Sequence, residues 1–204
     1  MKPLIIPALL LLLIKTPFLH AQISHQIDGN ARMSTQENQR VVSVIKESAA
    51  KTYMKRGLAR SSASEWDGAI SDFNKVIEIE PLNAVAYFNR GNAQQARGEH
   101  NRAIADYDKA ISINPRLAEA YNNRGVARQT NGDTAGALAD YEKAIENDPQ
   151  NARAYANRGL TRLFQGQETD AVRDFAQCKL LDYKLGESLE KRVKELKQRL
   201  ISQQ

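Results

Sequence analysis

The chain has 204 residues, of which 26% are charged and 42% hydrophobic, and its formal net charge is +5. This composition excludes a chain that is disordered throughout and fits one ordinary domain or one array of small units. Two basic residues, Lys2 and Lys15, lie in an N-terminal leader that we expect to be removed. Of the 29 basic residues, 27 then remain against 24 acidic ones, and a net charge of +3 is too small to indicate a nucleic-acid-binding protein.

Residues 1–21 have the pattern of a signal peptide. Lys2 precedes an apolar run over residues 4–14, which is shorter than the roughly 20 residues of a membrane span, and we expect cleavage after Ala21. The protein is then exported, and it is periplasmic or secreted if the source is bacterial. Because Lys15 interrupts the pattern directly after the apolar run, an uncleaved membrane anchor and a structural N-terminal segment remain alternatives.

Residues 22–39 are polar and are expected to form a linker between the leader and the folded part. The sequence "STQE" at residues 34–37 resembles a capping box, in which a hydroxyl and a carboxylate satisfy free backbone N–H groups. It predicts that a helix starts near Gln36. Residues 40–49 continue this helix as an N-terminal extension, whose apolar side includes Val44.

One phrase recurs along the rest of the chain with a fixed spacing of 34 residues. It reads AYFNRG from Ala86, AYNNRG from Ala120 and AYANRG from Ala154, and a fainter copy, KTYMKRG, lies one period upstream. A fixed period of this length is the sequence signature of stacked repeats. We therefore divide residues 50–185 into four units, which are 50–83, 84–117, 118–151 and 152–185.

The units agree at several positions when each is numbered from its first residue. Position 4 is tyrosine, position 8 glycine, position 20 alanine and position 24 aromatic, while position 32 is proline in the first three units and Tyr183 in the fourth. The residues are Tyr53, Tyr87, Tyr121 and Tyr155; Gly57, Gly91, Gly125 and Gly159; Ala69, Ala103, Ala137 and Ala171; Phe73, Tyr107, Tyr141 and Phe175; and Pro81, Pro115 and Pro149. This pattern resembles the tetratricopeptide-repeat family, and the resemblance covers two-thirds of the chain.

The resemblance implies an all-α fold, a right-handed superhelical solenoid of four helix-turn-helix repeats. The residues themselves support this, because positions 2–14 and 18–31 are helix-length and apolar at three-to-four-residue spacing. Gly98, Gly132 and Gly166 lie between the two segments, where glycine allows the left-handed residue that ends a helix. Small side chains at positions 8 and 20 allow the paired helices to cross closely.

Residues 186–204 are expected to form a C-terminal capping helix. Its apolar residues recur at helical spacing and would cover the exposed flank of the fourth unit; they are Leu189, Val193, Leu196 and Leu200. Because the segment "EKRVKELKQR" is basic, a helix that binds a membrane surface or a partner is the alternative.

No motif for catalysis, cofactor binding or metal binding is found in the sequence. Outside the leader only His25 and His100 are present, far from any metal-ligand spacing, and no Gly-rich phosphate loop or serine elbow occurs. The single cysteine, Cys178, cannot form an internal disulfide and is expected to pack on an apolar helix face. We therefore expect a protein that is not an enzyme and that uses no cofactor.

In the family that the chain resembles, the first helices of successive units line a concave groove that binds a peptide or helix of a partner. The resemblance places the following residues in that groove: Lys51, Lys55, Phe88, Asn89, Asn92, Gln95, Asn122, Asn123, Gln129, Arg153 and Asn157. The lining is mixed, with amides in the middle and apolar residues near the fourth unit. An asparagine at position 6 has an alternative role, in which its amide bonds the backbone of the inter-repeat turn.

The resemblance therefore predicts a non-catalytic scaffold or adaptor for a protein or peptide partner, and no nucleic acid. Two alternatives are a membrane-surface protein that acts through the basic C-terminal helix, and an accessory subunit of a cell-envelope enzyme or transport complex. Membrane contact is expected only through an uncleaved leader or that helix. Some relatives clamp the C-terminal carboxylate of heat-shock chaperones; Asn92, Asn123 and Arg153 match the clamp, but Phe88 and Asn157 replace two of its basic residues, which should weaken it.

Arginine occupies position 7 in every unit, where the family more usually has leucine, and aspartate occupies position 23. An unpaired guanidinium packed between helices would be costly to desolvate. We predict that each arginine forms a bidentate bond to the aspartate of its own unit, tying the first helix to the second. The predicted structural ion pairs are Arg56–Asp72, Arg90–Asp106, Arg124–Asp140 and Arg158–Asp174. The alternative is four independent surface charges.

Overall fold

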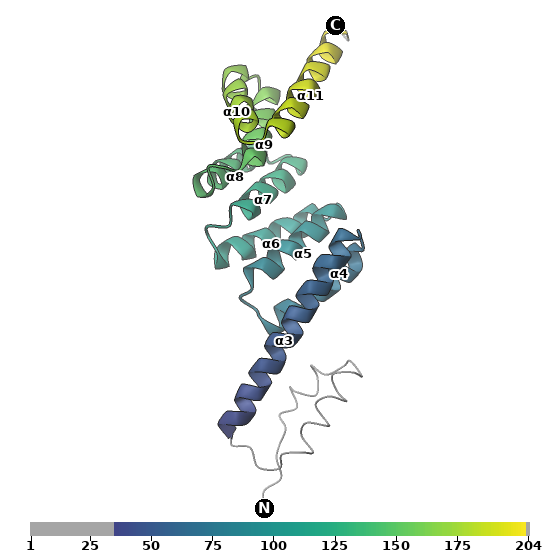
Figure 1. Cartoon of the computed structure of the whole chain (residues 1–204). Helices are drawn as coiled ribbons and strands as arrows, with labels where there is room; N and C mark the ends of the chain where they lie inside the picture. Colours follow the sequence, from purple (N-terminus) through teal and green to yellow (C-terminus); the bar gives the residue numbers. More distant parts are fainter. Residues whose placement is uncertain (1–34, 203–204) are drawn as a thin grey trace, which may run out of the picture. The chain divides into compact units, whose positions relative to one another are not determined.

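The computed structural model describes residues 35–202 (Figure 1). The predicted signal peptide, residues 1–21, lies outside the described residues, as do the linker up to residue 34 and the last two residues. Packing divides the chain after Lys46, and the compact unit described below begins at Glu47.

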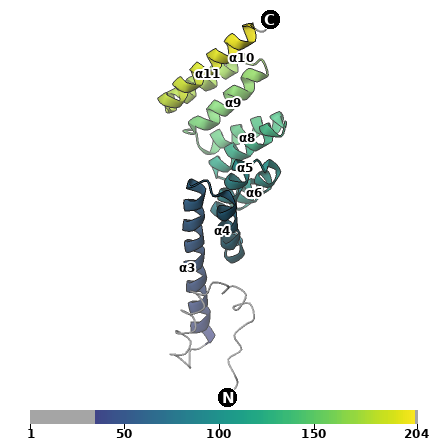
Figure 2. The same cartoon turned by 90° about the vertical axis from the view of Figure 1, so that its right-hand side faces the viewer.

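All regular structure in the described part is α-helical (Figure 2). The helices are α3 (Thr35–Ser62), α4 (Trp66–Ile79), α5 (Ala84–Ala96), α6 (His100–Ile113), α7 (Ala118–Thr130), α8 (Thr134–Asn147), α9 (Ala152–Phe164), α10 (Glu168–Leu181) and α11 (Tyr183–Ser202). From α4 onward, each helix packs against the next helix along the chain. The predicted fold class is confirmed, because the four units form an all-α array of sequential helix pairs.

Two boundaries differ from those expected. Helix α3 begins at Thr35, one residue before the start predicted near Gln36, so residues 35–39 belong to the helix and not to the linker expected over residues 22–39; its Val44 is 63% exposed. Helix α11 begins at Tyr183, so residues 183–185 belong to the last helix and not to the fourth unit. The reason is Asp182, whose extended backbone ends α10 and whose carboxylate accepts a hydrogen bond from the Leu185 N–H at 3.0 Å, in the first turn of α11.

The two helices of each unit are joined by the same turn. Gly98, Gly132 and Gly166 have φ values of +80°, +86° and +76°, and Ser64 takes their place in the first unit with φ 60°. In each turn the next N–H bonds a carbonyl five residues back, as Glu99 does to Gln94 at 2.9 Å. This is the hydrogen bond of a Schellman motif, which requires a left-handed residue and therefore favours glycine.

The core of each unit is built from the constant positions. Ala69, Ala103, Ala137 and Ala171 are fully buried, and the aromatic residue at position 24 lies against the glycine at position 8. A Cβ atom on Gly125 would lie 2.6 Å from Cε1 of Tyr141, which is closer than two carbon atoms can approach. Glycine is therefore required where the aromatic ring packs under the first helix.

Helix α11 covers the end of the fourth unit. Leu189 is buried against Phe175 and Cys178, and Val193 packs beside them. Gly186 allows a close crossing, because a Cβ atom there would lie 2.5 Å from Cβ of Lys179 on α10. Among the described residues, no helix is both long enough and apolar enough to span a bilayer.

Candidate functional site

The candidate site is the surface of the first helices of the units, α3, α5, α7 and α9, with the polar side chains that fix them in place. Helix α5 contacts α7, and α7 contacts α9, so these helices are neighbours in the array. Two sets of polar contacts hold them. The arginines at position 7 bond the second helices, and the amides at other positions bond one another.

The structure brings together each predicted arginine and aspartate in a two-pronged contact. Nε of the arginine donates to Oδ2 of the aspartate at 2.9, 2.7, 2.9 and 3.0 Å in units one to four. Nη2 donates to Oδ1 at 2.5 Å in the first unit and 2.6 Å in the others. The aspartate side chains are 2–8% exposed, whereas exposure of the arginines falls from 49% for Arg56 to 14% for Arg124.

A second arginine, at position 11, bonds the same aspartate in three units. Nη1 of Arg60, Arg128 and Arg162 donates to Oδ2 at 2.9 Å in each case. The second unit has Gln94 at this position, and its buried Oε1 has no hydrogen-bond partner within the described part of the chain. The sequence analysis missed this second contact, although arginine four residues after position 7 in three units was a visible signal.

The position-7 arginines also connect neighbouring units and stack on tyrosine. Nη1 of Arg90 donates to Asn74 at 2.6 Å, and Nη1 of Arg124 donates to Asp108 at 2.5 Å, in each case on the preceding second helix. Each guanidinium also lies 5.2–5.6 Å from the ring centre of the tyrosine three residues earlier. The recurring phrase is thus structural, because tyrosine supports the arginine, arginine bonds the aspartate and glycine admits the ring.

Amides on three first helices form a chain of hydrogen bonds. Nδ2 of Asn157 donates to Asn122 at 2.9 Å, Nδ2 of Asn122 donates to Asn123 at 3.0 Å, and Nδ2 of Asn123 donates to Oδ1 of Asn92 at 2.8 Å. We call these four residues the amide chain. It links α9 to α7 and α7 to α5, so these groove residues bond each other rather than the inter-repeat backbone.

Buried hydroxyl groups fix the amides of Asn92 and Gln129 through their oxygen atoms. The Tyr107 hydroxyl donates its single proton to Oδ1 of Asn92 at 2.8 Å, and the Tyr141 hydroxyl donates to Oε1 of Gln129 at 2.8 Å. The amide of Gln95 lies 2.9 Å from the Tyr107 hydroxyl oxygen and is engaged by it. The NH₂ groups of Asn92 and Gln129 make no hydrogen bond within residues 35–202, and they are not among the buried atoms without a partner. These two donors are available to a ligand.

The other predicted groove residues have varied surroundings. Asn89 bonds the Val85 carbonyl of its own helix at 2.8 Å, and Lys51 bonds Glu47 at 2.6 Å. Phe88 lies against Tyr107, with ring centres 6.1 Å apart. Lys55 and Arg153 are exposed. The chaperone clamp is therefore disfavoured, because two of its matching residues, Asn92 and Asn123, bond each other.

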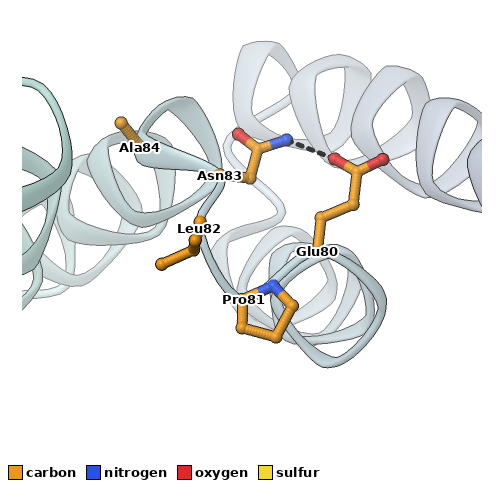
Figure 3. Close-up of a pocket in the computed structure, with 5 residues that line it drawn as sticks. All are labelled: Glu80, Pro81, Leu82, Asn83 and Ala84. Carbon is orange, nitrogen blue, oxygen red and sulfur yellow. Dashed lines mark hydrogen bonds between the residues drawn. The ribbon is translucent and has the colours of Figure 1, made fainter.

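Exposed apolar side chains flank the amides on the first helices. Leu58 on α3 is 42% exposed, Val85 on α5 is 52% exposed and Phe164 at the end of α9 is 68% exposed. Figure 3 shows the turn before α5, where residues 80–84 line a surface pocket and Asn83 donates to Glu80 at 2.6 Å. Within residues 35–202, no group of three or more His, Cys, Asp or Glu side chains is arranged to hold a metal ion.

The buried tyrosines predict an effect of alkaline pH on stability. Burial raises the pKa of Tyr107 and Tyr141 above the value of about 10 for an unfolded tyrosine. Because the pKa of each tyrosine is higher in the folded than in the unfolded state, the two neutral hydroxyls make their full contribution to the free energy of unfolding below about pH 10. This contribution decreases as the pH rises from there towards the folded-state pKa. Urea unfolding across this range should show a loss of stability that is smaller in the Tyr107→Phe, Tyr141→Phe double variant. Equal slopes for the two proteins would contradict the assignment.

Sequential helix pairs with constant contacts define a helical-repeat protein. Models of the tetratricopeptide-repeat family match residues 84–117, 118–151 and 140–173. Residues 84–173 therefore contain tetratricopeptide repeats. None of the curated proteins compared with the chain matches it.

Solved structures with a similar fold include MamA, which is 24% identical over 76% of this chain and 99% of that chain, with a TM-score of 0.62. The tetratricopeptide-repeat domain of Arabidopsis OM64 is 27% identical over 58% of this chain and 98% of that chain, with a TM-score of 0.57. The first such domain of Spaghetti (RPAP3), bound to the HSP90 peptide SRMEEVD, is 25% identical over 58% of this chain and 94% of that chain, with a TM-score of 0.57.

Proposed function

We propose that the chain is a non-catalytic scaffold that binds a peptide segment of another protein on the surface of α3, α5, α7 and α9. The observation that carries the proposal is the pair of free NH₂ groups on Asn92 and Gln129, whose oxygen atoms accept hydrogen bonds from the hydroxyls of Tyr107 and Tyr141. Fixed N–H donors match the carbonyl oxygens of an extended peptide, which occur at regular intervals and need no particular side chain.

Exposed apolar residues on α5 and α9 complete the proposed site. Val85 and Phe164 are accessible on α5 and α9, and Arg153 adds a positive charge. A few anchor side chains, mostly aromatic residues and arginine, supply most of the affinity in protein recognition, whereas amide contacts fix register and direction. The RPAP3 domain, which has a similar fold and is bound to an HSP90 peptide, supports the binding of a peptide by this chain.

We also propose that the protein acts after export, because of the leader over residues 1–21. N-terminal sequencing of the exported protein should then find Gln22 or a residue close to it. A role at a membrane surface through α11 is less well supported. Leu189 and Val193, two of its apolar residues, pack against the fourth unit and are not free to enter a bilayer.

The proposed site is tested by replacing residues that bind nothing else. Asn92 and Asn123 are unsuitable, because their loss would also remove a bond between α5 and α7. The triple variant Val85→Ala, Arg153→Ala, Phe164→Ala should reduce capture of the partner at least about tenfold, as expected for loss of more than 1.4 kcal/mol of binding energy. Its melting temperature should stay nearly unchanged.

Capture is measured by cross-linking and pull-down from the native compartment, followed by affinity measurement with the identified partner. The matched control is Lys75→Ala with Lys109→Ala, which changes exposed side chains on the second helices α4 and α6. Full capture by the triple variant, together with loss in the control, would place the site on the second helices and overturn the proposal.

A further inference from the structure

The outer face of α10 carries an apolar stripe that the other units lack. Val172 is 62% exposed, Leu180 is 79% exposed and Ala176 between them is also exposed. A spacing of four residues places the three side chains on one side of the helix, over three turns. Tyr183, 63% exposed at the start of α11, follows them. We call these four residues the α10 stripe.

In the earlier units, the residues that correspond to Ala176 and Leu180 are polar. Position 25, which is Ala176 in the fourth unit, is Asn74, Asp108 or Glu142 elsewhere, and position 29, which is Leu180, is Glu78, Ser112 or Glu146. At position 25 the polar side chain bonds an arginine of the next unit. Among the side chains that the structure describes, α11 makes no such arginine contact, and Ala176 replaces the polar residue at position 25.

The first position of the stripe is also uncovered only in the fourth unit. At position 21, Ile70 packs beside Ala93 of the next unit and Ile104 packs beside Ala127. Val172 occupies the same position, but α11 leaves it 62% exposed. The stripe is therefore a stacking surface that the chain itself does not cover and whose side chains suit an apolar neighbour.

We propose that a second copy of the chain covers this surface, with the two α10 helices packed antiparallel across a twofold axis near Ala176. The stripe is almost symmetric about this alanine, with a larger apolar residue four positions away on each side. An antiparallel copy packs Val172 of one helix against Leu180 of the other, while the small Ala176 allows the helices to approach closely.

The helix dipoles favour the same arrangement, because the dipoles of two antiparallel α10 helices are opposed, whereas a parallel pair would align them. The charged residues of α10 are already engaged within one chain, since Asp170 bonds Arg173 at 3.0 Å and Lys179 bonds Glu190 of α11 at 2.8 Å. They therefore do not compete with the apolar contact of the stripe. The stripe lies on a second helix, so the dimer leaves the peptide surface of the first helices free.

The dimer is tested by sedimentation velocity of the purified chain over a wide range of concentration. The contact involves three turns of helix and Tyr183, and an interface of this small size predicts a dissociation constant of roughly micromolar order. Ala176→Asp with Leu180→Glu installs residue types that position 25 and position 29 already have in folded units. We expect this variant to weaken the dimer at least about tenfold without lowering the melting temperature.

Two further experiments test whether the molecule that covers the α10 stripe is a second copy of the chain. Leu82→Glu removes an equally exposed leucine from a different surface and should leave the dimer intact, since Leu82 is 75% exposed at the turn before α5. Mixing a Val172→Glu, Leu180→Glu chain with a Val172→Lys, Leu180→Lys chain should form heterodimers, although each chain alone is monomeric. A wild-type chain that stays monomeric, or a dimer that persists in the Ala176→Asp, Leu180→Glu variant, would overturn the proposal.

Discussion

Replacing Asp140 by alanine should lower the free energy of unfolding by about 3 kcal/mol, because it breaks a buried ion pair and leaves Arg124 with only the half-exposed Asp108 as a counter-charge. The Asp140 side chain is 3% exposed and accepts three hydrogen bonds, two from Arg124 and one from Arg128. Without it, the guanidinium of Arg124, which is only 14% exposed, remains between the helices. Urea unfolding followed by circular dichroism measures the loss.

The chain offers a matched control on the same arginine. Asp108 lies 2.5 Å from Nη1 of Arg124, but its side chain is 50% exposed. Solvent screens such a contact, so Asp108→Ala should cost less than about 1 kcal/mol. In double-mutant cycles, Arg124 should couple strongly to Asp140 and weakly to Asp108. Equal, small losses for the two aspartates would show that burial does not strengthen the Arg124–Asp140 contact.

The loss of stability on replacing the position-7 arginine should depend on how exposed its side chain is in each unit. Arg56 forms the same two bonds as Arg124, but its side chain is 49% exposed. Because water already reaches Arg56, we expect Arg56→Ala to be less destabilising than Arg124→Ala, although the two residues occupy the same position of their units.

The repeat and the Arg–Asp contacts could be predicted from the sequence because each depends on positions at one fixed period. Arginine at position 7 and aspartate at position 23 depart from the usual family pattern together in all four units, which indicates that they are partners. The glycine at position 8 and the aromatic residue at position 24 are linked in the same way, by the space that one leaves for the other.

The amide chain could not be predicted by the same reasoning. Asn92 and Asn123 are 31 residues apart, and Asn122 and Asn157 are 35 apart, so neither pair shares a position in its units. Their contact depends on how neighbouring first helices are rotated against each other. A repeat spacing of 34 residues does not predict this rotation. Ser64 was also not predicted, because a non-glycine residue with positive φ is favoured only when the surrounding turn requires it.

The second large effect concerns the glycine of the recurring phrase. Gly125→Ala should destabilise the protein by about 2 kcal/mol, since overpacking a filled core costs about 1–3 kcal/mol. The new Cβ atom would lie 2.6 Å from Cε1 and 2.9 Å from Cδ1 of Tyr141, and 3.2 Å from the Ala137 carbonyl oxygen. The ring has little freedom to move, because Tyr141 is fully buried and its hydroxyl bonds Gln129 at 2.8 Å.

Helix propensity acts in the opposite direction, so the sign of the change decides which effect dominates. Alanine is better than glycine inside a helix by about 1 kcal/mol, and Gly125 lies in the middle of α7. If the steric contact dominates, urea unfolding will show a loss, and Tyr141→Leu combined with Gly125→Ala will cost less than the sum of the two single changes. A gain in stability for Gly125→Ala would mean that the two helices do not cross as closely as their glycine and aromatic side chains indicate.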